Sequence, residues 1–129
     1  MAGEAATLRG RRILVVEDDY LLAQVLSDYL EEAEVEVIGP VGSVDEALAL
    51  VENESRGFDG AILDVNLHGS KSYPIADALA ERSIPFLFAT GYGRDALDGR
   101  FRDRPRCEKP FDQATLLSVF GRLFNNHSA

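Results

Sequence analysis

The sequence predicts an α/β fold in which a doubly wound parallel sheet of five strands forms a single domain. Short apolar runs alternate with longer segments of helical period, which is typical of βαβ folds with a buried sheet. A chain of 129 residues has room for one such domain. Apolar residues make up 46% of the chain and charged residues 27%. This composition is typical of a folded globular protein rather than a disordered chain.

The first half of the chain contains two strand and helix units. Residues 13–16 form the first apolar run, and apolar side chains then recur at helical spacing from 21 to 30. A second strand over 35–38 is expected to end in a turn at Gly39-Pro40. Ser43 and Glu46 then make a capping box, which predicts a second helix.

The second half repeats the pattern less regularly. A third strand over 61–63 ends at Asp64, and Pro74 suits the first turn of a helix that reaches about residue 82. The fourth strand covers 85–89. Glycines then weaken the helical pattern, so we expect a short or mobile fourth helix, within 94–98.

The last unit is a fifth strand over 106–108 and a final helix for which Asp112 is a good N-cap. The expected domain covers residues 11–125. Residues 1–10 are expected to be a flexible N-terminus and 126–129 a tail, because neither can bury enough surface to offset ordering.

Composition excludes several classes of function. Thirteen Lys and Arg against 22 Asp and Glu give a net charge of −9, which argues against a nucleic-acid or anionic-membrane surface. Cys107 is the one cysteine, so an intramolecular disulfide or a thiolate metal cluster cannot form. The sequence shows no signal peptide and no apolar run of membrane-spanning length. We therefore expect a cytoplasmic protein.

Acidic side chains dominate the predicted functional edge of the sheet. In a doubly wound sheet, functional groups gather beyond the carboxyl ends of the strands. These positions hold Glu17 and Asp18 after the first strand, Asp64 after the third, Thr90 after the fourth and Lys109 after the fifth. Two carboxylates about 4 Å apart repel by about 4 kcal/mol at an effective dielectric near 20, so a counter-cation is expected. Hard oxygen ligands favour Mg²⁺, or else Mn²⁺, over zinc, and Mg²⁺ in turn suits phosphoryl chemistry.

Other polar residues are given structural interpretations. Asp19 is interpreted as an exposed acid in the first helical turn, pointing away from the pocket. Cys107 is interpreted as a small buried hydrophobic residue, and His68 and His127 as exposed loop and tail residues. Residues 94–109 contain more basic than acidic side chains, and this local face could dock an acidic surface of a protein partner.

Together, Val15-Val16-Glu17-Asp18, Asp64, Thr90 and Lys109-Pro110-Phe111 resemble a response-regulator receiver domain over residues 12–124. The resemblance implies a flavodoxin-like fold with strand order 2-1-3-4-5.

The resemblance also implies a role for each matched residue. Asp64 would be the phosphoacceptor. Glu17, Asp18 and Asp64 would hold Mg²⁺ together with the backbone carbonyl of Asn66. The Thr90 hydroxyl would contact the phosphoryl group, and Lys109 would neutralise charge on the phosphoryl oxygens.

The segment Pro85-Phe86-Leu87-Phe88-Ala89-Thr90-Gly91-Tyr92 is similar to the signature of the FAT GUY group of single-domain receivers. Arg106 stands three residues before Lys109, where many receivers have an aromatic switch residue. Switching is therefore expected to depend on ordering of the segment from 91 to 104.

The sequence thus predicts a stand-alone response regulator, not an enzyme, that accepts a phosphoryl group from a histidine kinase onto Asp64 and signals through altered protein binding. Its further partner would be an unknown downstream protein or a histidine phosphotransferase. One alternative is a phosphate sink or relay intermediate for a kinase. Another is a flavodoxin-like enzyme or cofactor carrier, which the acidic first loop disfavours because it lacks a phosphate cradle. A third is a receiver-like binding domain that has lost phosphorylation, which the presence of every matched site residue disfavours.

Overall fold

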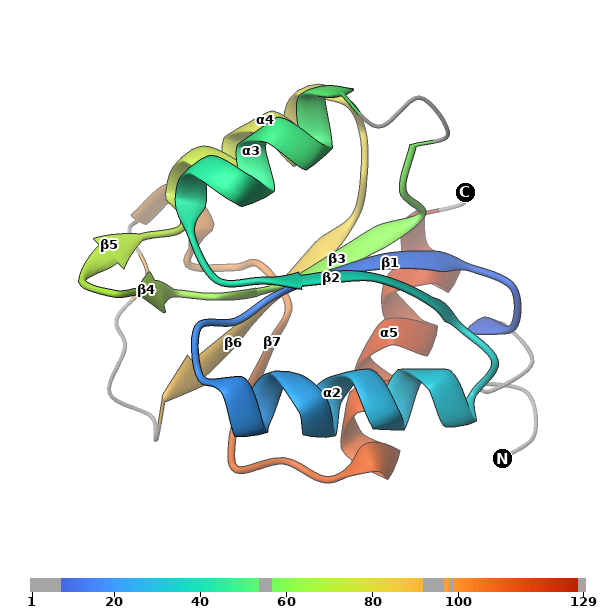
Figure 1. Ribbon diagram of the computed structural model, residues 1–129. Coiled ribbons are helices and arrows are strands. Elements are labelled where there is room, and N and C mark those ends of the chain that lie inside the picture. Colours follow the sequence, from blue (N-terminus) through green and yellow to red (C-terminus); the bar gives the residue numbers. More distant parts are fainter. Residues whose placement is uncertain (1–7, 54–56, 92–96, 98, 128–129) are drawn as a thin grey trace.

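A computed structural model of the chain describes residues 8–53, 57–91, 97 and 99–127 (Figure 1). Its main feature is a five-stranded parallel sheet with the order β2-β1-β3-β6-β7. The strands are β1 (Arg12–Val16), β2 (Glu36–Val41), β3 (Gly60–Asp64), β6 (Phe86–Gly91) and β7 (Arg106–Lys109). In the order of the five predicted strands this is 2-1-3-4-5, so the predicted flavodoxin-like fold is confirmed.

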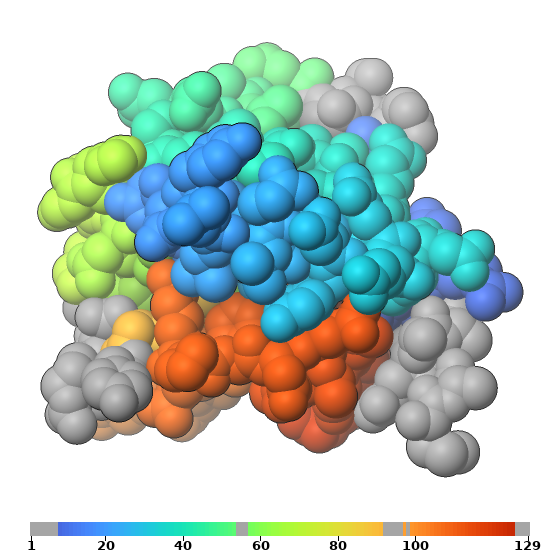
Figure 2. All heavy atoms as spheres, turned by 60° about the horizontal axis from the view of Figure 1, so that its bottom comes forward, coloured from blue at the N-terminus to red at the C-terminus, as the bar shows by residue number. Residues whose placement is uncertain are grey.

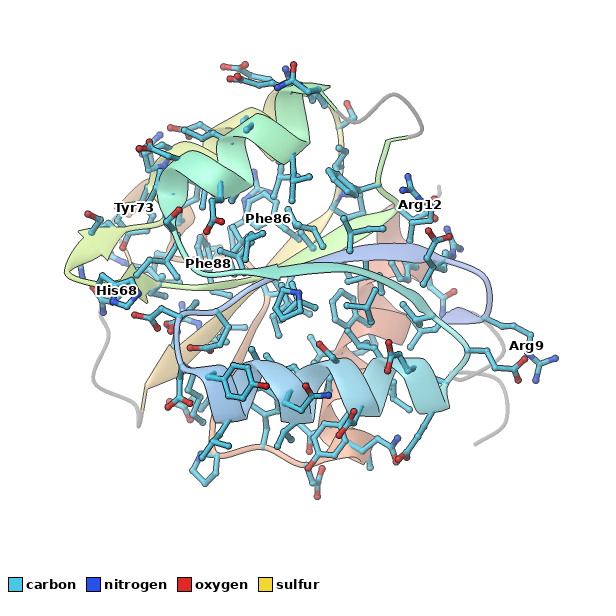
Figure 3. The ribbon with its side chains drawn as sticks, in the orientation of Figure 1. Arg9, Arg12, His68, Tyr73, Phe86 and Phe88 are labelled. Atoms are coloured by element: carbon cyan, nitrogen blue, oxygen red, sulfur yellow. The ribbon has the colours of Figure 1, made fainter. Side chains whose placement is uncertain are left out.

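Helices cover both faces of this sheet (Figure 1). The helices α2 (Tyr20–Glu32) and α5 (Gln113–His127) lie on one face, and α3 (Val44–Asn53) and α4 (Tyr73–Glu81) on the other. Every residue of β3 is buried, as a central strand covered on both faces must be. Phe88 packs edge-on against Tyr73 and Phe86 within the α3 and α4 layer, where Figure 3 shows all three rings.

Side-chain caps begin three of the helices. The Asp19 carboxylate accepts a hydrogen bond from the Leu22 amide at 3.1 Å and so caps α2 from the position before its first turn. Ser43 and Glu46 form the predicted capping box at α3. Asp112 caps α5 through the Thr115 amide at 2.8 Å.

A two-stranded antiparallel hairpin, which the sequence analysis did not predict, directly follows β3. It consists of β4 (Asn66–Leu67) and β5 (Ser70–Lys71), joined by His68 and Gly69. Both turn residues have positive φ angles, 51° and 87°, as a two-residue type I′ turn requires. The hairpin escapes period-based prediction because each strand is only two residues long.

One predicted turn was wrong. Gly39-Pro40 is not a turn after the second strand but lies inside β2, where the register with β1 shifts. The expected domain bounds at residues 11 and 125 stay predictions. Near these bounds, Leu8 is fully buried in the α2 and α5 layer, and α5 continues to His127.

The expected fourth helix over 94–98 falls mostly outside the described residues. Beyond it, Gly99–Phe101 form a short 3-10 helix, η1, whose Phe101 ring stacks on Tyr73 at 5.0 Å. Among the described residues, no helix combines the length and apolar character that crossing a membrane would need.

Candidate functional site

The five candidate side chains meet where β1, β3, β6 and β7 end. Alternation along the strands directs Glu17, Asp64 and Lys109 toward the α2 and α5 face, and Asp18 and Thr90 toward the α3 and α4 face. The site therefore straddles the end of the sheet.

Lys109 is the cation that joins the acidic side chains of the site. Its Nζ lies 3.0 Å from Glu17 Oε1 and 3.1 Å from Asp64 Oδ2. The two carboxylates raise the pKa of Lys109, although burial acts first and in the opposite direction. One ammonium thus pairs with two buried carboxylates, while a third carboxylate, Asp18, lies beside them.

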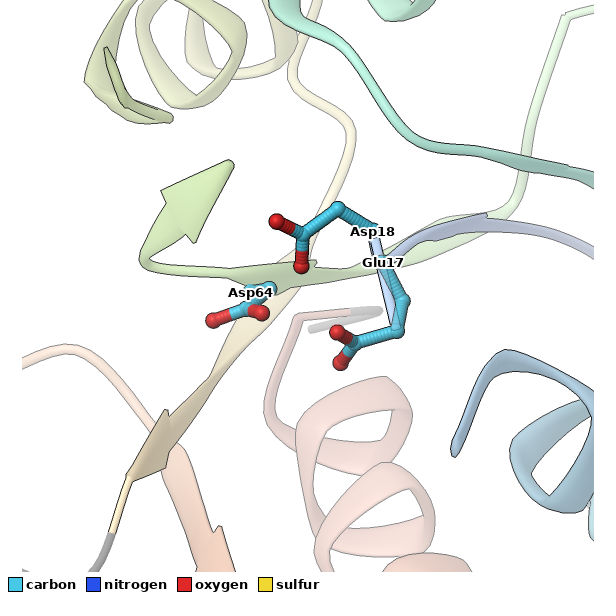
Figure 4. Close-up of side chains that lie close together, drawn as sticks. All are labelled: Glu17, Asp18 and Asp64. Carbon is cyan, nitrogen blue, oxygen red and sulfur yellow. The ribbon is translucent and has the colours of Figure 1, made fainter. Parts of the chain in front are cut away.

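The three carboxylates form a compact group. Glu17, Asp18 and Asp64 each offer an oxygen, and these oxygens lie within 4.8 Å of one another (Figure 4). Hard oxygen donors at this separation fit the coordination that Mg²⁺ takes from proteins. Of the described residues, no other set of at least three His, Cys, Asp or Glu side chains lies this close together.

Glu17 is the carboxylate whose ionisation is most strongly affected. Burial, followed by its hydrogen bond with Asp64, raises the pKa of Glu17 from 4.5 to about 7. The Asp19 amide donates to Glu17 Oε2 at 3.1 Å and opposes the shift in part. The Glu17 carboxyl group is therefore protonated more readily than a glutamate in water.

Asp18 differs from Glu17 because it is half-exposed and has a donor from another element. Burial would raise its pKa, but the hydrogen bond from the His68 amide, then its hydrogen bond with Glu17, outweigh burial and lower it. The His68 amide lies 2.8 Å from Asp18 Oδ2, and His68 Nδ1 lies 3.6 Å from the same oxygen. Asp18 therefore stays ionised.

The remaining two candidate residues also lie beside Asp64. The Asn66 amide donates to Asp64 Oδ1 at 3.3 Å. Thr90 is 2% exposed and follows Ala89, the partner of Asp64 in the β3 and β6 pairing. Its hydroxyl makes no hydrogen bond to any described residue, so it is a buried donor without an acceptor.

Sequence reasoning missed one contact of this site. His68 was interpreted as an exposed loop residue, and its imidazole is indeed exposed, but its backbone amide binds Asp18. The only sequence signal for this contact is Gly69, which fits the second position of a tight turn. Asp19 was interpreted as an acid of the first helical turn, but it is the N-cap of α2.

Comparison with known proteins agrees with this geometry. The family model described as response regulator receiver domain matches residues 13–120. The chain belongs to this family. Receiver domains are signalling domains of two-component systems rather than enzymes of metabolism, and histidine kinases phosphorylate them.

The relatives of this receiver domain include regulators of several kinds. The transcriptional regulatory protein PdtaR of Mycobacterium tuberculosis is 30% identical over 111 residues, which are 83% of this chain and 53% of that protein. The chain thus spans about half the length of that relative. The solution structure of SdrG from Sphingomonas melonis Fr1 is 47% identical, with a TM-score of 0.79, and covers 91% of this chain and 97% of that one. The response regulator PhyR from Brucella abortus, 24% identical over 98% of this chain and 53% of that one, shares the fold with a TM-score of 0.82.

Proposed function

We propose that this receiver domain accepts a phosphoryl group from the phosphohistidine of a histidine kinase onto Asp64. The observation that carries the proposal is the placement of Lys109 Nζ between Asp64 and Glu17, with Asp18 beside them. An acceptor carboxylate needs positive charge around it to receive a phosphoryl group, and Lys109 together with a divalent cation held by the carboxylates would supply it.

Each side chain has a role in that transfer. An oxygen of Asp64 forms the new O–P bond while the N–P bond of the phosphohistidine breaks and its electron pair stays on the imidazole. Lys109 neutralises charge on the phosphoryl oxygens. The unpartnered Thr90 hydroxyl is a donor for one of those oxygens.

The carboxylates fit a divalent cation. Glu17, Asp18 and Asp64 would hold Mg²⁺ together with the backbone carbonyl of Asn66. When bound, Mg²⁺ supplies positive charge for the transferring phosphoryl group.

The face next to the site suits a protein donor. Tyr20 and Leu21 are 80% and 74% exposed, and Val25 is 40% exposed, all in the first half of α2. Figure 2 shows α2, in blue, at the surface beside α5, in orange. Because α2 begins directly after Asp18 and Asp19, a partner that packs on these apolar side chains would reach the pocket.

The output would be altered protein binding in the cytoplasm. A groove of about 540 Å³ lies between the edge strand β7 and α5, and Arg106, Phe111, Val119 and Arg122 are among its lining residues. Its lining holds two exposed arginines, Arg106 and Arg122, and two exposed acids, Glu108 and Asp112, so a partner surface with charges of both signs would suit it. A phosphate sink would use the same site without such a partner.

The test is phosphorylation with acetyl phosphate and Mg²⁺, followed by intact mass measurement. The wild type should gain one phosphoryl group, and Asp64→Asn should gain none. Asp59→Asn, which changes a carboxylate at the opposite end of β3, is the matched control and should gain the group normally. Phosphorylation of Asp64→Asn to the level of the wild type would exclude the assignment.

A further inference from the structure

The hairpin after β3 contacts two of the three clustered carboxylates. The Asn66 amide, in β4, binds Asp64 Oδ1, and the His68 amide, in the turn, binds Asp18 Oδ2. Asp18 follows β1, so the hairpin connects the ends of two neighbouring strands. Figure 4 shows the Asp18 side chain near Asp64 and Glu17.

The core and the backbone hold this hairpin in place. Leu67 is almost fully buried in the α3 and α4 layer. The Ser72 amide donates to the Val65 carbonyl at 2.9 Å and closes the base of the hairpin. The position of the turn amide is therefore determined by the fold, provided that His68 and Gly69 keep their positive φ angles.

We propose that the turn formed by His68 and Gly69 positions Asp18 for the divalent cation. This inference rests on the proposed function. The turn amide donates to Oδ2 and so restricts rotation of the carboxylate, which would orient Asp18 toward the cation. Partners of metal-binding side chains of this kind typically change metal affinity by about 10- to 100-fold. His68 and Gly69 are positioning residues in this account, since they act through Asp18.

A substitution at Gly69 should perturb the backbone of the turn and leave the packing around it unchanged. A Cβ atom at Gly69 would meet no atom within 4 Å beyond its chain neighbours, so the first side-chain carbon has open space. The φ angle of 87° nevertheless disfavours any β-branched residue. Gly69→Val should therefore displace the turn amide without disturbing the packing of the site.

Gly10 is the matched control. It has a φ angle of 80°, and a Cβ atom there also meets nothing within 4 Å. It precedes β1 and lies at the opposite end of the sheet from Asp18. Gly10→Val should bring a similar backbone strain without touching the site.

The experiment is calorimetric titration of the full chain with MgCl₂. Gly69→Val should weaken Mg²⁺ binding about tenfold, whereas Gly10→Val should bind within twofold of the wild type. His68→Asn keeps the amide and favours a positive φ angle, so it should also bind within twofold. In the metal-free wild type, the His68 amide proton should be protected from hydrogen exchange, and Asp18→Ala should remove that protection.

Three results with the variants would overturn the inference. They are wild-type affinity in Gly69→Val, an equal loss in Gly10→Val, or a tenfold loss in His68→Asn, which would assign the effect to the imidazole. These results leave the proposed function intact when the wild type still binds Mg²⁺ and Asp64 is still phosphorylated. A wild type that binds no Mg²⁺ overturns the inference, and failure of Asp64 to accept the phosphoryl group overturns the proposed function itself.

Discussion

The two ends of the central sheet differ in how their cationic and acidic side chains are paired. At the amino end, Arg9 pairs with Glu34 and Arg12 with Glu36, one cation to each carboxylate. At the carboxyl end, the ammonium of Lys109 pairs with both Glu17 and Asp64, and a third carboxylate, Asp18, lies beside them. Figure 3 shows Arg9 and Arg12 at one end of the molecule and His68 at the other.

Burial increases this contrast. The side chains of Arg9 and Glu34 are 65% and 63% exposed, so water screens their attraction. Glu17 and Asp64 are buried, so water does not screen the repulsion between their carboxylates in this way. The amino end is thus balanced, as expected of a structural region, whereas the carboxyl end carries an excess of negative charge that suits a cation.

Removal of the ammonium from the carboxyl end should give the largest effect on stability. Lys109→Met leaves Glu17 and Asp64 buried without their cation. We expect the free energy of unfolding at pH 8, measured by urea denaturation without metal, to fall by about 3 kcal/mol, at the low end for a broken buried pair because Lys109 is partly exposed. The loss should be smaller at pH 5, where Glu17 can take up a proton. Equal losses at the two pH values would contradict this account.

Glu17 should make the metal-free protein less stable as pH rises. Its pKa is raised in the folded state from 4.5 to about 7, so the folded chain holds the proton more tightly. The resulting stabilisation is complete below pH 4.5 and is lost as pH rises through 7. Between pH 5 and 8 the free energy of unfolding should fall by about 2 kcal/mol more in the wild type than in Glu17→Gln.

The matched variant for that comparison is Glu34→Gln at the amino end, which should keep the pH dependence of the wild type. Urea denaturation in the presence of a chelator at several pH values gives the three curves. Identical curves for Glu17→Gln and the wild type would show that Glu17 is not responsible.

Mg²⁺ should compensate part of the excess negative charge at the carboxyl end of the sheet. At ten times its dissociation constant, Mg²⁺ should raise the free energy of unfolding by about 1.4 kcal/mol, because it binds the folded chain. Asp18→Asn should abolish this gain and Asp59→Asn should retain it. Thermal melts with and without MgCl₂ make the measurement, and a gain of equal size in both variants would place the cation elsewhere.

The smallest effect is expected at the amino end. Arg9→Met removes one partner of an exposed ion pair and should change the free energy of unfolding by about 0.5 kcal/mol or less. The same denaturation experiment measures it. A loss as large as that of Lys109→Met would remove the contrast between the two ends.

The sequence predicted the carboxyl end better than the connections around it. Each candidate residue follows a buried strand, and parallel strands bring such positions together whatever the loops do. The placement of Lys109 beside Asp64 could therefore be expected from strand ends alone. The resemblance to receiver domains added the individual roles.

Local backbone geometry could not be predicted in the same way. Gly39-Pro40 has the composition of a turn but lies within β2, because an edge strand tolerates a proline that a central strand does not. The His68 amide carries no side-chain signal at all, and its bond to Asp18 depends on two positive φ angles. Contacts made by the backbone of short turns are therefore the part of this site that needed the structure.

Where the cation binds can be measured most directly with Mn²⁺, a paramagnetic substitute for Mg²⁺, added to the isotopically labelled chain. The account predicts that amide signals around Asp18, Asp64 and Asn66 broaden first, while those around Arg12 and Asp59 remain sharp. Broadening that instead spreads along the exposed acids of α2, or that begins at the amino end, would contradict a divalent-cation site at the carboxyl ends of the strands.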